Sequence, residues 1–360
     1  MNKIVYLDSK RRRPAAPGNT SDAAAPENDS RRPARQTPPG VTIVMVSYHT
    51  GPVLDESITA ALSQDVGIEL VLVDNGNPAA VTSALVARGV EDPRIRVITG
   101  HGNIGYAAAC NLGARGARGE YLLLLNPDCV LQPGTLAELV RLTETAPRPW
   151  IAGCRIINPD GTDQRGSRRE LPTPWLTLVE ALRLDRMAPN HPYFRRLNQH
   201  DQPLPESVTA VPAVSGACML MHLDDYLTLG GMDERYFLHV EDLDLCFATA
   251  RMGGTVLFVP QVSLIHYKST SDASVVRIEW CKARGFTHYF RKNFTGLYPS
   301  FFLRSVNLLV WGYFMLRLSS LARMAVVRGV AGLLRVGRPV QGADDSRGEA
   351  EKRGRKGWAA

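Results

Sequence analysis

A carboxylate closes the most apolar strand-like segment of the chain. The stretch YLLLLNPDCVL (121–131) passes directly from a run of leucines to Asn126, Pro127 and Asp128. A continuous apolar run bounded by turn residues predicts a strand that is buried on both faces. A carboxylate at the end of such a strand is a hard oxygen ligand, which suits Mg²⁺ or Mn²⁺ bridging two phosphates. We therefore expect Asp128 to hold a metal ion at the edge of a sheet.

Polar side chains also end two earlier segments that are expected to be strands. The segment 41–50 closes with Ser47 and Tyr48 among its last residues, and the segment 68–76 closes with Asp74. In open parallel sheets, ligands bind beyond the carboxyl ends of the strands, near a switch in strand order. The carboxylate of Asp74 could accept hydrogen bonds from a base N–H or from ribose hydroxyls. The alternative is that polar residues at strand ends only form turns.

The second concentration of carboxylates lies in MDERYFLHVEDLDLC (232–246). Glu241 and Asp242 stand at the start of an expected helix, followed by Asp244. Helix N-termini favour negative side chains, so capping alone could account for one or two of them. The functional alternative is a general base that removes a proton from an attacking hydroxyl. Asp244, two residues beyond Asp242, is expected to point elsewhere and to cap the helix.

Two further candidates carry weaker signals. The segment 100–119 places glycines before an expected helix, but it contains neither G-x-G-x-x-G nor G-x-x-x-x-G-K-[ST]. Asn103 and Gly105 at this helix start can bring amides close to an anionic ligand. His266 closes an apolar strand, where a histidine is more often structural. Beside Asp128, its imidazole could supply a further metal ligand.

Alternating strands and helices must bring these residues together. Strands are expected at 41–50, 68–76, 94–100 and 120–126, and helices at 52–64, 79–88, 104–117 and 133–146. This alternation is typical of βαβ units around a mostly parallel sheet. Later in the chain, 150–161, 208–222 and 255–267 are expected to be extended and 241–254 helical, whereas 162–208 gives no assignment. One mixed α/β domain over 41–276 accounts for the pattern.

The two ends of the chain differ in charge from its middle. Residues 1–40 carry 8 Lys/Arg against 4 Asp/Glu, residues 41–276 carry 18 against 26, and residues 277–360 carry 16 against 5. Basic ends suit an anionic membrane face or nucleic acid, or they are merely soluble tails. The composition of 1–40, rich in Pro, Ala and Arg, predicts a disordered tail, and 341–360 is expected to be another.

The cysteines and the first residues bear on the compartment. Six cysteines are scattered along the chain without a C-x-x-C pair, so neither a zinc site nor a disulfide framework is indicated. This usage favours a reducing compartment. The stretch MNKIVYLDSKRRRPAAPG lacks the apolar run of a signal peptide. We therefore expect the domain to face the cytoplasm.

The basic C-terminal region is also strongly apolar. Between 301 and 339, arginines interrupt the apolar residues, and the longest uncharged run, 305–316, has 12 residues. A bilayer span needs about 20 apolar residues. The pattern therefore predicts one or two amphipathic helices within 277–340 that lie on a membrane surface, with arginines close to lipid phosphates. The alternative is a helical hairpin packed on the domain or in a dimer interface.

The motifs together resemble a known family. VTIVMVSYHT, ELVLVDNG, GNIGYAAACNLGAR, YLLLLNPDCVL, VSGACMLMH and FLHVEDLDLCFATARMGG span about 41–267. In this order they resemble an inverting family 2 glycosyltransferase of the GT-A fold, in its rhamnosyltransferase-like branch. The resemblance implies an α/β fold, a single Rossmann-like GT-A domain with a mostly parallel sheet and a C-terminal helical membrane-associating extension.

The resemblance also assigns roles to the candidate residues. It implies a nucleotide-diphosphate sugar bound by Ser47, Tyr48, Asp74, Asn103, Gly105, Asn126 and Asp128, with Mg²⁺ or Mn²⁺ held by Asp128 and His266. The family's Asp-x-Asp metal motif corresponds to Asn126-Pro127-Asp128, so Asp128 carries the metal role largely alone. Glu241 and Asp242 match the acidic catalytic pair, with Asp242 as the base.

The implied function is a hexosyl transfer at a membrane. The first expectation is L-rhamnose from dTDP-rhamnose, moved to a hydroxyl of a polysaccharide or lipid-linked saccharide by a peripheral protein on the inner face of the cell membrane; a homodimer is left open. The alternative function is a non-catalytic nucleotide-sugar or carbohydrate-binding scaffold. Nucleic-acid binding is disfavoured, because the basic segments lack the interleaved aromatic residues of a base-stacking surface.

Overall fold

The computed structural model describes residues 40–187, 191, 193–194, 197–200, 202–268 and 274–336. Within these ranges, the side chains of Asp185 and of residues 324–336 are not described. All of the described residues belong to one compact unit. The tails expected at 1–40 and 341–360 lie outside the described residues, apart from Gly40.

A mixed sheet forms the centre of this unit. Four strands pair in parallel in the order β3-β2-β1-β4, and β10 then joins antiparallel between β4 and β6. The pair β6·β11 is parallel again, and β5 and β8 pair antiparallel with β11. The strands are β1 Val41–Ser47, β2 Ile68–Asp74, β3 Ile95–Ile98, β4 Tyr121–Leu125, β5 Cys129–Leu131, β6 Trp150–Ile157, β8 Thr209–Ala210, β10 Cys218–His222 and β11 Thr255–His266.

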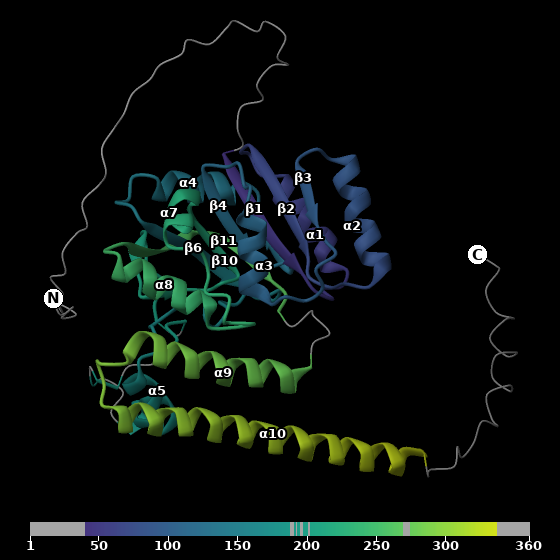
Figure 1. The fold of residues 1–360 in the computed structure, drawn as a ribbon. Helices are drawn as coiled ribbons and strands as arrows, with labels where there is room; N and C mark the ends of the chain where they lie inside the picture. Colours follow the sequence, from purple (N-terminus) through teal and green to yellow (C-terminus); the bar gives the residue numbers. More distant parts are fainter. Residues whose placement is uncertain are drawn as a thin grey trace, which may run out of the picture. The chain divides into compact units, whose positions relative to one another are not determined.

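Helices cover both faces of the sheet because its strands are apolar on both sides. In β4, Leu122 and Leu124 belong to one buried cluster, whereas Leu123 and Leu125 belong to the other. The second cluster includes side chains of α1 Val53–Leu62, α2 Ala79–Glu91 and α4 Thr135–Thr143. The first includes side chains of α3 Tyr106–Ala114, α7 Leu223–Thr228 and α8 Glu241–Arg251. The sheet and its helices form the layered body in Figure 1.

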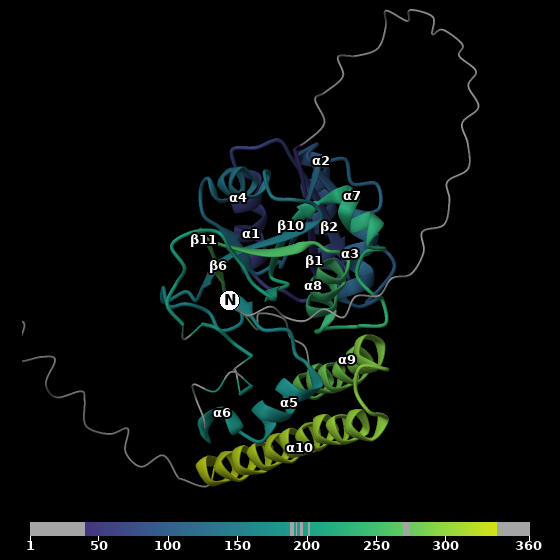
Figure 2. The same ribbon diagram turned by 90° about the vertical axis from the view of Figure 1, so that its left-hand side faces the viewer.

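Two long helices, α9 Val275–Phe294 and α10 Ser300–Val336, follow the last strand. They lie side by side below the sheet in Figures 1 and 2, with α5 Pro174–Ala181 and α6 Leu184–Met187 beside α10. Tyr289 and Phe290 of α9 and Val306 of α10 join the first core cluster, so the α9–α10 hairpin packs on the domain. The boundary expected at 276 stays a prediction.

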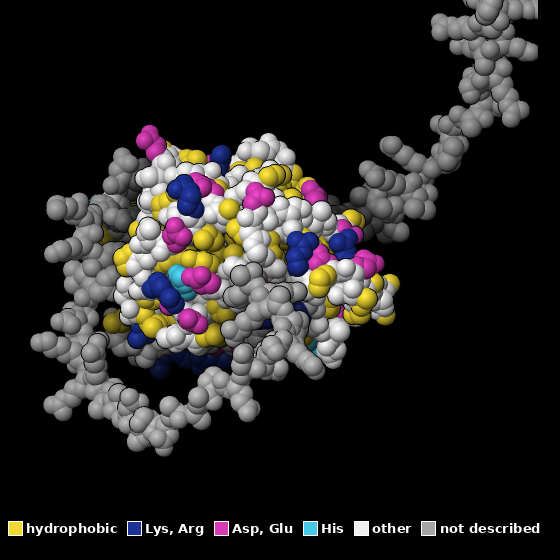
Figure 3. All heavy atoms as spheres, turned by 90° about the horizontal axis from the view of Figure 1, so that it is seen from above, with side chains coloured by type: hydrophobic (Ala, Val, Ile, Leu, Met, Phe, Trp, Pro, Cys, Tyr) yellow, Lys and Arg dark blue, Asp and Glu magenta, His cyan; other side chains and the backbone are white. Residues whose placement is uncertain are grey.

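The two outer surfaces of this unit differ in character. Figure 3 shows the face turned away from α9 and α10, where acidic and basic side chains are interspersed among apolar ones. On α10, by contrast, Phe301, Leu308 and Leu316 are 72%, 74% and 67% exposed. Within the described residues, Ser300–Arg323 is one helical segment whose length and hydropathy suffice to cross a membrane. The longest uncharged run, 305–316, is shorter than this segment, because the segment includes charged residues; the placement on a membrane surface stays a prediction.

The expected strands and helices through α4 are confirmed, as are β6, α8 and β11. The sequence did not predict the strand β5, the helices α5, α6 and α7, or the strand β7 Arg168–Arg169, which pairs with β9 Ala213–Val214 in the segment 208–222 that was expected to be extended. These strands contain two or three residues, too few for an alternation pattern to identify them.

Candidate active site

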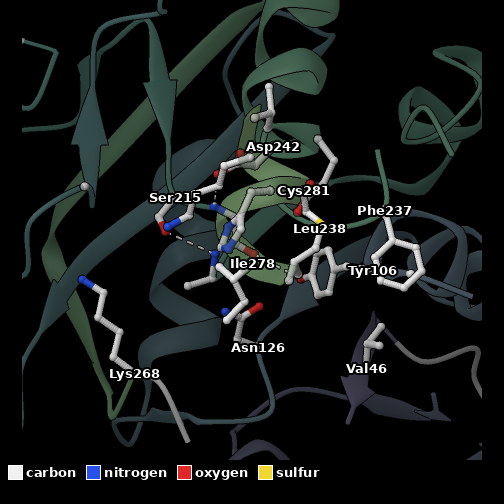
Figure 4. Close-up of a pocket in the computed structure, with 18 of the residues that line it drawn as sticks. Val46, Tyr106, Asn126, Ser215, Phe237, Leu238, Asp242, Lys268, Ile278 and Cys281 are labelled. Atoms are coloured by element: carbon white, nitrogen blue, oxygen red, sulfur yellow. Dashed lines mark hydrogen bonds between the residues drawn. The ribbon is translucent and has the colours of Figure 1, made fainter. Parts of the chain in front are cut away.

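A cavity of about 830 Å³ opens beyond the carboxyl ends of β1 and β4. In the strand order β3-β2-β1-β4, the chain order switches between β1 and β4, although all four strands are parallel. Open sheets bind ligands at such a switch point. Of the strand-end residues expected to face a ligand, Tyr48, Asn126 and Asp128 line the cavity. In the view of Figure 4, Asp242 and Ser215 lie on one side, Asn126 and Val46 on the other, and Lys268 at the edge.

Asp128 and His266 meet because β5 pairs with the end of β11. The Cα partner of His266 is Cys129, and the amide of Tyr267 donates to the carbonyl of Asp128 over 3.1 Å. This register brings the Oδ1 atom of Asp128 to 3.1 Å from Nε2 of His266. Both residues are buried, and both line the cavity.

Gln164 fixes the orientation of the His266 ring. Its side-chain nitrogen donates to the carbonyl of His266 over 3.0 Å and to Oδ1 of Asn158 over 2.9 Å. The amide oxygen is therefore the atom that faces Nδ1 of His266, at 2.8 Å, and Nδ1 must donate to it. In a neutral ring this leaves the lone pair on Nε2, directed at the carboxylate of Asp128. Such an arrangement is stable when a cation lies between the two groups or when the ring is charged.

The donor set around Asp128 fits a divalent metal ion. Asp128, Cys129 and His266 offer ligand atoms that lie within 4.8 Å of one another. Burial, and then the charge of Asp128, raise the pKa of the Cys129 thiol well above its ordinary value, and a soft sulfur ligand suits neither Mg²⁺ nor Mn²⁺. A carboxylate oxygen and an imidazole nitrogen remain. A carboxylate suits Mg²⁺ and Mn²⁺, and the imidazole favours Mn²⁺ of these two.

Asp74 lies behind the cavity and not in its lining. One oxygen accepts from the amide and side chain of Asn77 over 2.9 and 2.8 Å, and the other accepts from Thr82 and Thr99 over 2.6 and 2.8 Å. Burial opposes ionisation, but these four bonds outweigh it and keep the pKa of Asp74 below its ordinary value. Ser47 is fully buried and accepts from the same Asn77 side chain over 3.1 Å. In this structure both residues build the floor of the site.

Asn103 and Gly105 line the cavity in a tightly bonded turn. The oxygen of the Asn103 side chain accepts from Gly105 N over 3.1 Å and from Asn75 Nδ2 over 3.2 Å. Gly105 has a φ of 88°, and a Cβ there would come within 2.7 Å of the carbonyl of Phe237. That carbonyl accepts from Tyr106 N over 2.7 Å. The amides at this helix start thus already have acceptors in the protein.

Glu241 and Asp242 reach the cavity through a left-handed turn. His239 and Val240, just before α8, have φ values of 69° and 79°. For non-glycine residues this conformation costs energy, and it commonly marks a functional site. Burial, and then the charge of Lys282, lower the pKa of His239 to about 4, so this ring is neutral near pH 7. Both carboxylates that follow are buried and line the cavity.

The carboxylate of Asp242 is held by three donors. Its Oδ2 forms an ion pair with Nη2 of Arg169 and accepts from the amide of Gly216 over 2.9 Å. Its Oδ1 accepts from the amide of Leu243 over 2.9 Å. A Cβ at position 216 would lie 2.9 Å from the Asp242 side chain, so glycine is needed for this approach.

Glu241 lies in a different environment. Burial, and then the charge of Asp242, raise the pKa of Glu241 to about 8, so its carboxyl group is mostly protonated near pH 7. Among the described residues, its Oε2 atom has no hydrogen-bond partner. Tyr106, whose pKa burial raises well above its ordinary value, is a close neutral neighbour, and its hydroxyl donates to the carbonyl of Gly216 over 3.3 Å.

Asp244 points away from the cavity, as expected, but it does not cap the helix. Its oxygens accept from Tyr236 Oη over 3.1 Å, from Lys292 Nζ over 2.6 Å and from Asn293 Nδ2 over 2.8 Å. Among the described residues, no side chain caps α8, whose N-cap is Val240. The capping role expected of Asp244 is therefore wrong, because the partners on α9 attract its side chain.

The sequence reasoning missed Gln164, Arg169 and Gly216. The first two lie in the segment that gave no assignment, and only the pairing of β7 with β9 brings Arg169 to Asp242. The glycine in VSGACMLMH was visible as a break between two extended runs. Four further basic residues line the same cavity: Arg165, Lys268, Arg277 and Lys282.

Comparisons with known proteins agree with this geometry. Residues 42–209 match the model of glycosyl transferase family 2. The chain is 30% identical over 241 residues to the N-acetylglucosaminyl-diphospho-decaprenol L-rhamnosyltransferase of Mycobacterium tuberculosis, covering 64% of this chain and 76% of that protein. It is 26% identical to the rhamnosyltransferase WbbL of Escherichia coli, over 49% of this chain and 62% of that one.

A solved structure shares the fold. The crystal structure of GalNAc-T7 with UDP, GalNAc and Mn²⁺ matches with a TM-score of 0.52 at 16% identity, covering 71% of this chain and 48% of that chain. The present chain thus spans about half of that protein, and the likeness concerns the fold alone.

Proposed function

We propose that this chain, which belongs to glycosyl transferase family 2 and is a glycosyltransferase, is an inverting, metal-dependent enzyme. Its donor would be a nucleotide-diphosphate sugar. The observation that carries the proposal is the position of Asp242. Its carboxylate pairs with the guanidinium of Arg169, and it lines the same cavity as the Asp128–His266 pair. A proton acceptor and a diphosphate-metal site in one cavity are the two parts that such a transfer needs.

The transfer would take place in one displacement. The acceptor hydroxyl oxygen attacks the anomeric carbon while the bond from that carbon to the diphosphate oxygen breaks. The hydroxyl proton passes to Asp242, and the electron pair of the broken bond leaves with the nucleoside diphosphate. Because attack and departure occur on opposite faces, the configuration inverts and no covalent sugar-enzyme intermediate forms.

Asp128 and His266 are the residues that would hold the metal ion. When bound, a divalent ion neutralises the charge that develops on the leaving diphosphate. Gln164 fixes the ring of His266, and the β5·β11 pairing fixes the backbone of Asp128, so the two ligands are positioned before any ligand arrives.

The donor and acceptor are proposed from the relatives. The M. tuberculosis relative is named for transferring L-rhamnose to a diphospho-decaprenol-linked sugar, and the E. coli relative is also named a rhamnosyltransferase. We therefore propose dTDP-L-rhamnose as donor and a lipid-linked or polymeric saccharide as acceptor. The four additional basic residues of the cavity suit an anionic substrate of this kind.

Helix α10 would place the enzyme at the inner face of the membrane. One side of α10 packs on α9, where Trp311 donates to Thr287 over 3.1 Å. Its exposed residues include Leu308 and Leu316, with Arg317 directly after the latter. An apolar exposed face with flanking arginines fits a bilayer surface with anionic lipids.

Vesicle binding tests this placement. The double substitution Leu308→Asp and Leu316→Asp should abolish co-sedimentation with vesicles that contain phosphatidylglycerol. Val90→Asp is the matched control, because Val90 is 83% exposed on α2. Equal binding by all three proteins would refute the role of α10.

A thermal-shift panel tests the proposed site. We would compare dTDP, UDP, GDP and NAD, each with and without Mg²⁺ or Mn²⁺. A nucleotide at 100 times its Kd should add about 2.7 kcal/mol to the free energy of unfolding. We expect a metal-dependent shift with dTDP that Asp128→Ala removes. A folded protein without a shift for any nucleotide would contradict the function, and a shift that survives Asp128→Ala would contradict the metal site.

A further inference from the structure

We propose that Arg169 is a positioning residue that keeps the negative charge of the Glu241–Asp242 pair on Asp242 and directs one oxygen of that carboxylate at the acceptor hydroxyl. The inference deepens the proposed function and rests on it. The family comparison gives Arg169 no role, and the sequence alone gives no reason to separate it from the arginine before it.

Two adjacent arginines have opposite surroundings. In the β7·β9 pair, Arg168 lies opposite Val214 and Arg169 opposite Ala213, so their side chains leave the strand on opposite faces. Arg168 donates to the carbonyls of Gln199, Gln202 and Pro203 and lies over the ring of Phe258 at 5.2 Å. Arg169 instead lines the cavity and pairs with Asp242. The first binds loop carbonyls, whereas the second contacts the base.

The hydrogen bonds of Asp242 leave one acceptor position. An ionised carboxylate has about four lone-pair sites. Oδ2 accepts from Arg169 and Gly216, and Oδ1 accepts from Leu243. The remaining site is on Oδ1, in a side chain that lines the cavity. Arg169 and Gly216 together fix the rotation of the carboxylate, so this site is defined before an acceptor binds.

Arg169 also makes the carboxyl groups of Glu241 and Asp242 different in their tendency to ionise. Two neighbouring buried carboxyl groups cannot both ionise cheaply. The titratable groups described around Asp242 come from its own helix, the preceding turn, β7 and α9: Glu241, His239, Cys246, Tyr289, Arg169, Lys282 and Glu279. His239, Cys246 and Tyr289 are neutral near pH 7. Lys282 pairs with Glu279 over 3.1 Å, whereas Arg169 pairs with Asp242 itself.

The proton balance of the reaction is consistent with this role. Arg169 stays protonated throughout, because a guanidinium does not lose its proton in proteins. The hydroxyl proton goes to Asp242, and Arg169 then faces a neutral acid until that proton leaves to water. Glu241 keeps its own proton and does not compete for the one that is transferred.

The pH profile of turnover tests the proposal. The probe is release of dTDP from dTDP-L-rhamnose in the presence of a synthetic lipid-linked N-acetylglucosaminyl diphosphate. In Arg169→Gln we expect the acidic limb of kcat/KM to move up by about one pH unit. Activity below the limb should fall about tenfold per unit and should recover toward high pH. Arg169→Lys, which keeps the charge, should move the limb less.

The matched control is Arg165→Gln, which removes the same charge from the same cavity. Arg165 pairs with Glu180 at 3.5 Å and not with Asp242, so its acidic limb should stay in place whatever happens to its rate. A uniform loss in Arg169→Gln without movement of the limb would show a merely structural role and overturn the proposal. Turnover in Asp242→Asn equal to wild type would instead overturn the proposed function itself.

A second measurement needs no substrate. The difference in Tm between wild type and Arg169→Gln should be largest near neutral pH and should shrink in acid, because the ion pair exists only while Asp242 is ionised. A difference that is the same at every pH would contradict the charge-holding role. If Arg169→Gln does not fold, the same comparison is made with Arg169→Met, which also removes the charge.

Discussion

Asp242 and Asp244 lie two residues apart on α8, one facing the cavity and the other facing α9. Asp242 has a single cationic partner, Arg169, and two backbone donors. Asp244 accepts from Lys292, Asn293 and Tyr236, all of them side chains. Each carboxylate accepts from three donors among the described residues, but Asp242 lines the cavity, whereas Asp244 lies against side chains of α9.

The cluster around Asp244 extends to a second carboxylate. Asp233 accepts from Lys292 over 2.8 Å, from Arg235 over 2.6 Å and from His288 over 3.2 Å. Although burial acts in the opposite direction, these hydrogen bonds hold the pKa of Asp233 well below its ordinary value. Lys292 thereby bridges the loop before α8, α8 itself and α9, and it anchors the helix whose first turns form one wall of the cavity.

The difference separates a structural cluster from a catalytic one. The charges around Asp244 are paired with one another and lie outside the cavity, so they rigidify their surroundings without contacting a substrate. Glu241 and Asp242 line the cavity: Oε2 of Glu241 has no partner among the described residues, and the pKa of this group is raised to about 8 by burial and by Asp242. Strained backbone at His239 and Val240 points to the same site.

The largest effect is expected from substitution of the two carboxylates compared above, Asp242 and Asp244. Asp242→Asn should lower turnover about 10³-fold, because it removes the proton acceptor but keeps the shape of the side chain. Asp244→Asn should keep turnover per folded molecule and lower the free energy of unfolding instead. Steady-state rates and urea unfolding of both variants provide the measurement. Comparable loss of turnover in the two variants would mean that the clusters do not differ in role.

The next effect concerns the structural cluster. Lys292→Met should lower the free energy of unfolding by about 1.5 kcal/mol, because it removes a cation shared by the buried Asp244 and the half-buried Asp233. Arg291→Met is the matched control on the same helix, since Arg291 is exposed. Urea denaturation of both variants at pH 7 measures the difference. Equal stabilities would show that the Lys292 bridge is not what holds α9.

A smaller effect is expected in the pH dependence of the free energy of unfolding, which Glu241 should influence. The pKa of Glu241 is raised from 4.5 to about 8, so the neutral form stabilises the fold below pH 4.5 and this contribution is lost as the pH rises through 8. Between pH 5 and 8.5, wild type should therefore lose up to about 4 kcal/mol more stability than Glu241→Gln. Parallel stability curves for the two proteins would refute a buried, neutral Glu241.

The sequence predicted those parts of the structure that a pattern within one continuous segment of the chain reveals. The apolar runs ending in Asp74 and Asp128, and the acidic start of α8, predicted the sheet, the switch point and the carboxylates that line the cavity. Asp128 and His266 were proposed as one site although 138 positions separate them. That pairing came from a family resemblance and depends on the three-residue strand β5, which no periodicity reveals.

The remaining parts of the site depend on contacts that the sequence does not encode locally. Arg168 and Arg169 are the same residue type on a two-residue strand, and only the register with β9 shows which one faces Asp242. Asp244 resembled a helix cap because its partners on α9 lie almost 50 residues further along the chain. Asp74 has the residue type of a ligand contact, yet its four bonds to Asn77, Thr82 and Thr99 place it behind the cavity.

The central claim is a single displacement with Asp242 as the proton acceptor. The measurement that tests it most directly is the anomeric configuration of the product, determined by NMR on the saccharide formed from dTDP-L-rhamnose. The account predicts a linkage opposite in configuration to that of the donor, formed by wild type and lost in Asp242→Asn. A product that retains the configuration of the donor would require a covalent or front-face route, and it would contradict the assignment of Asp242 as the base.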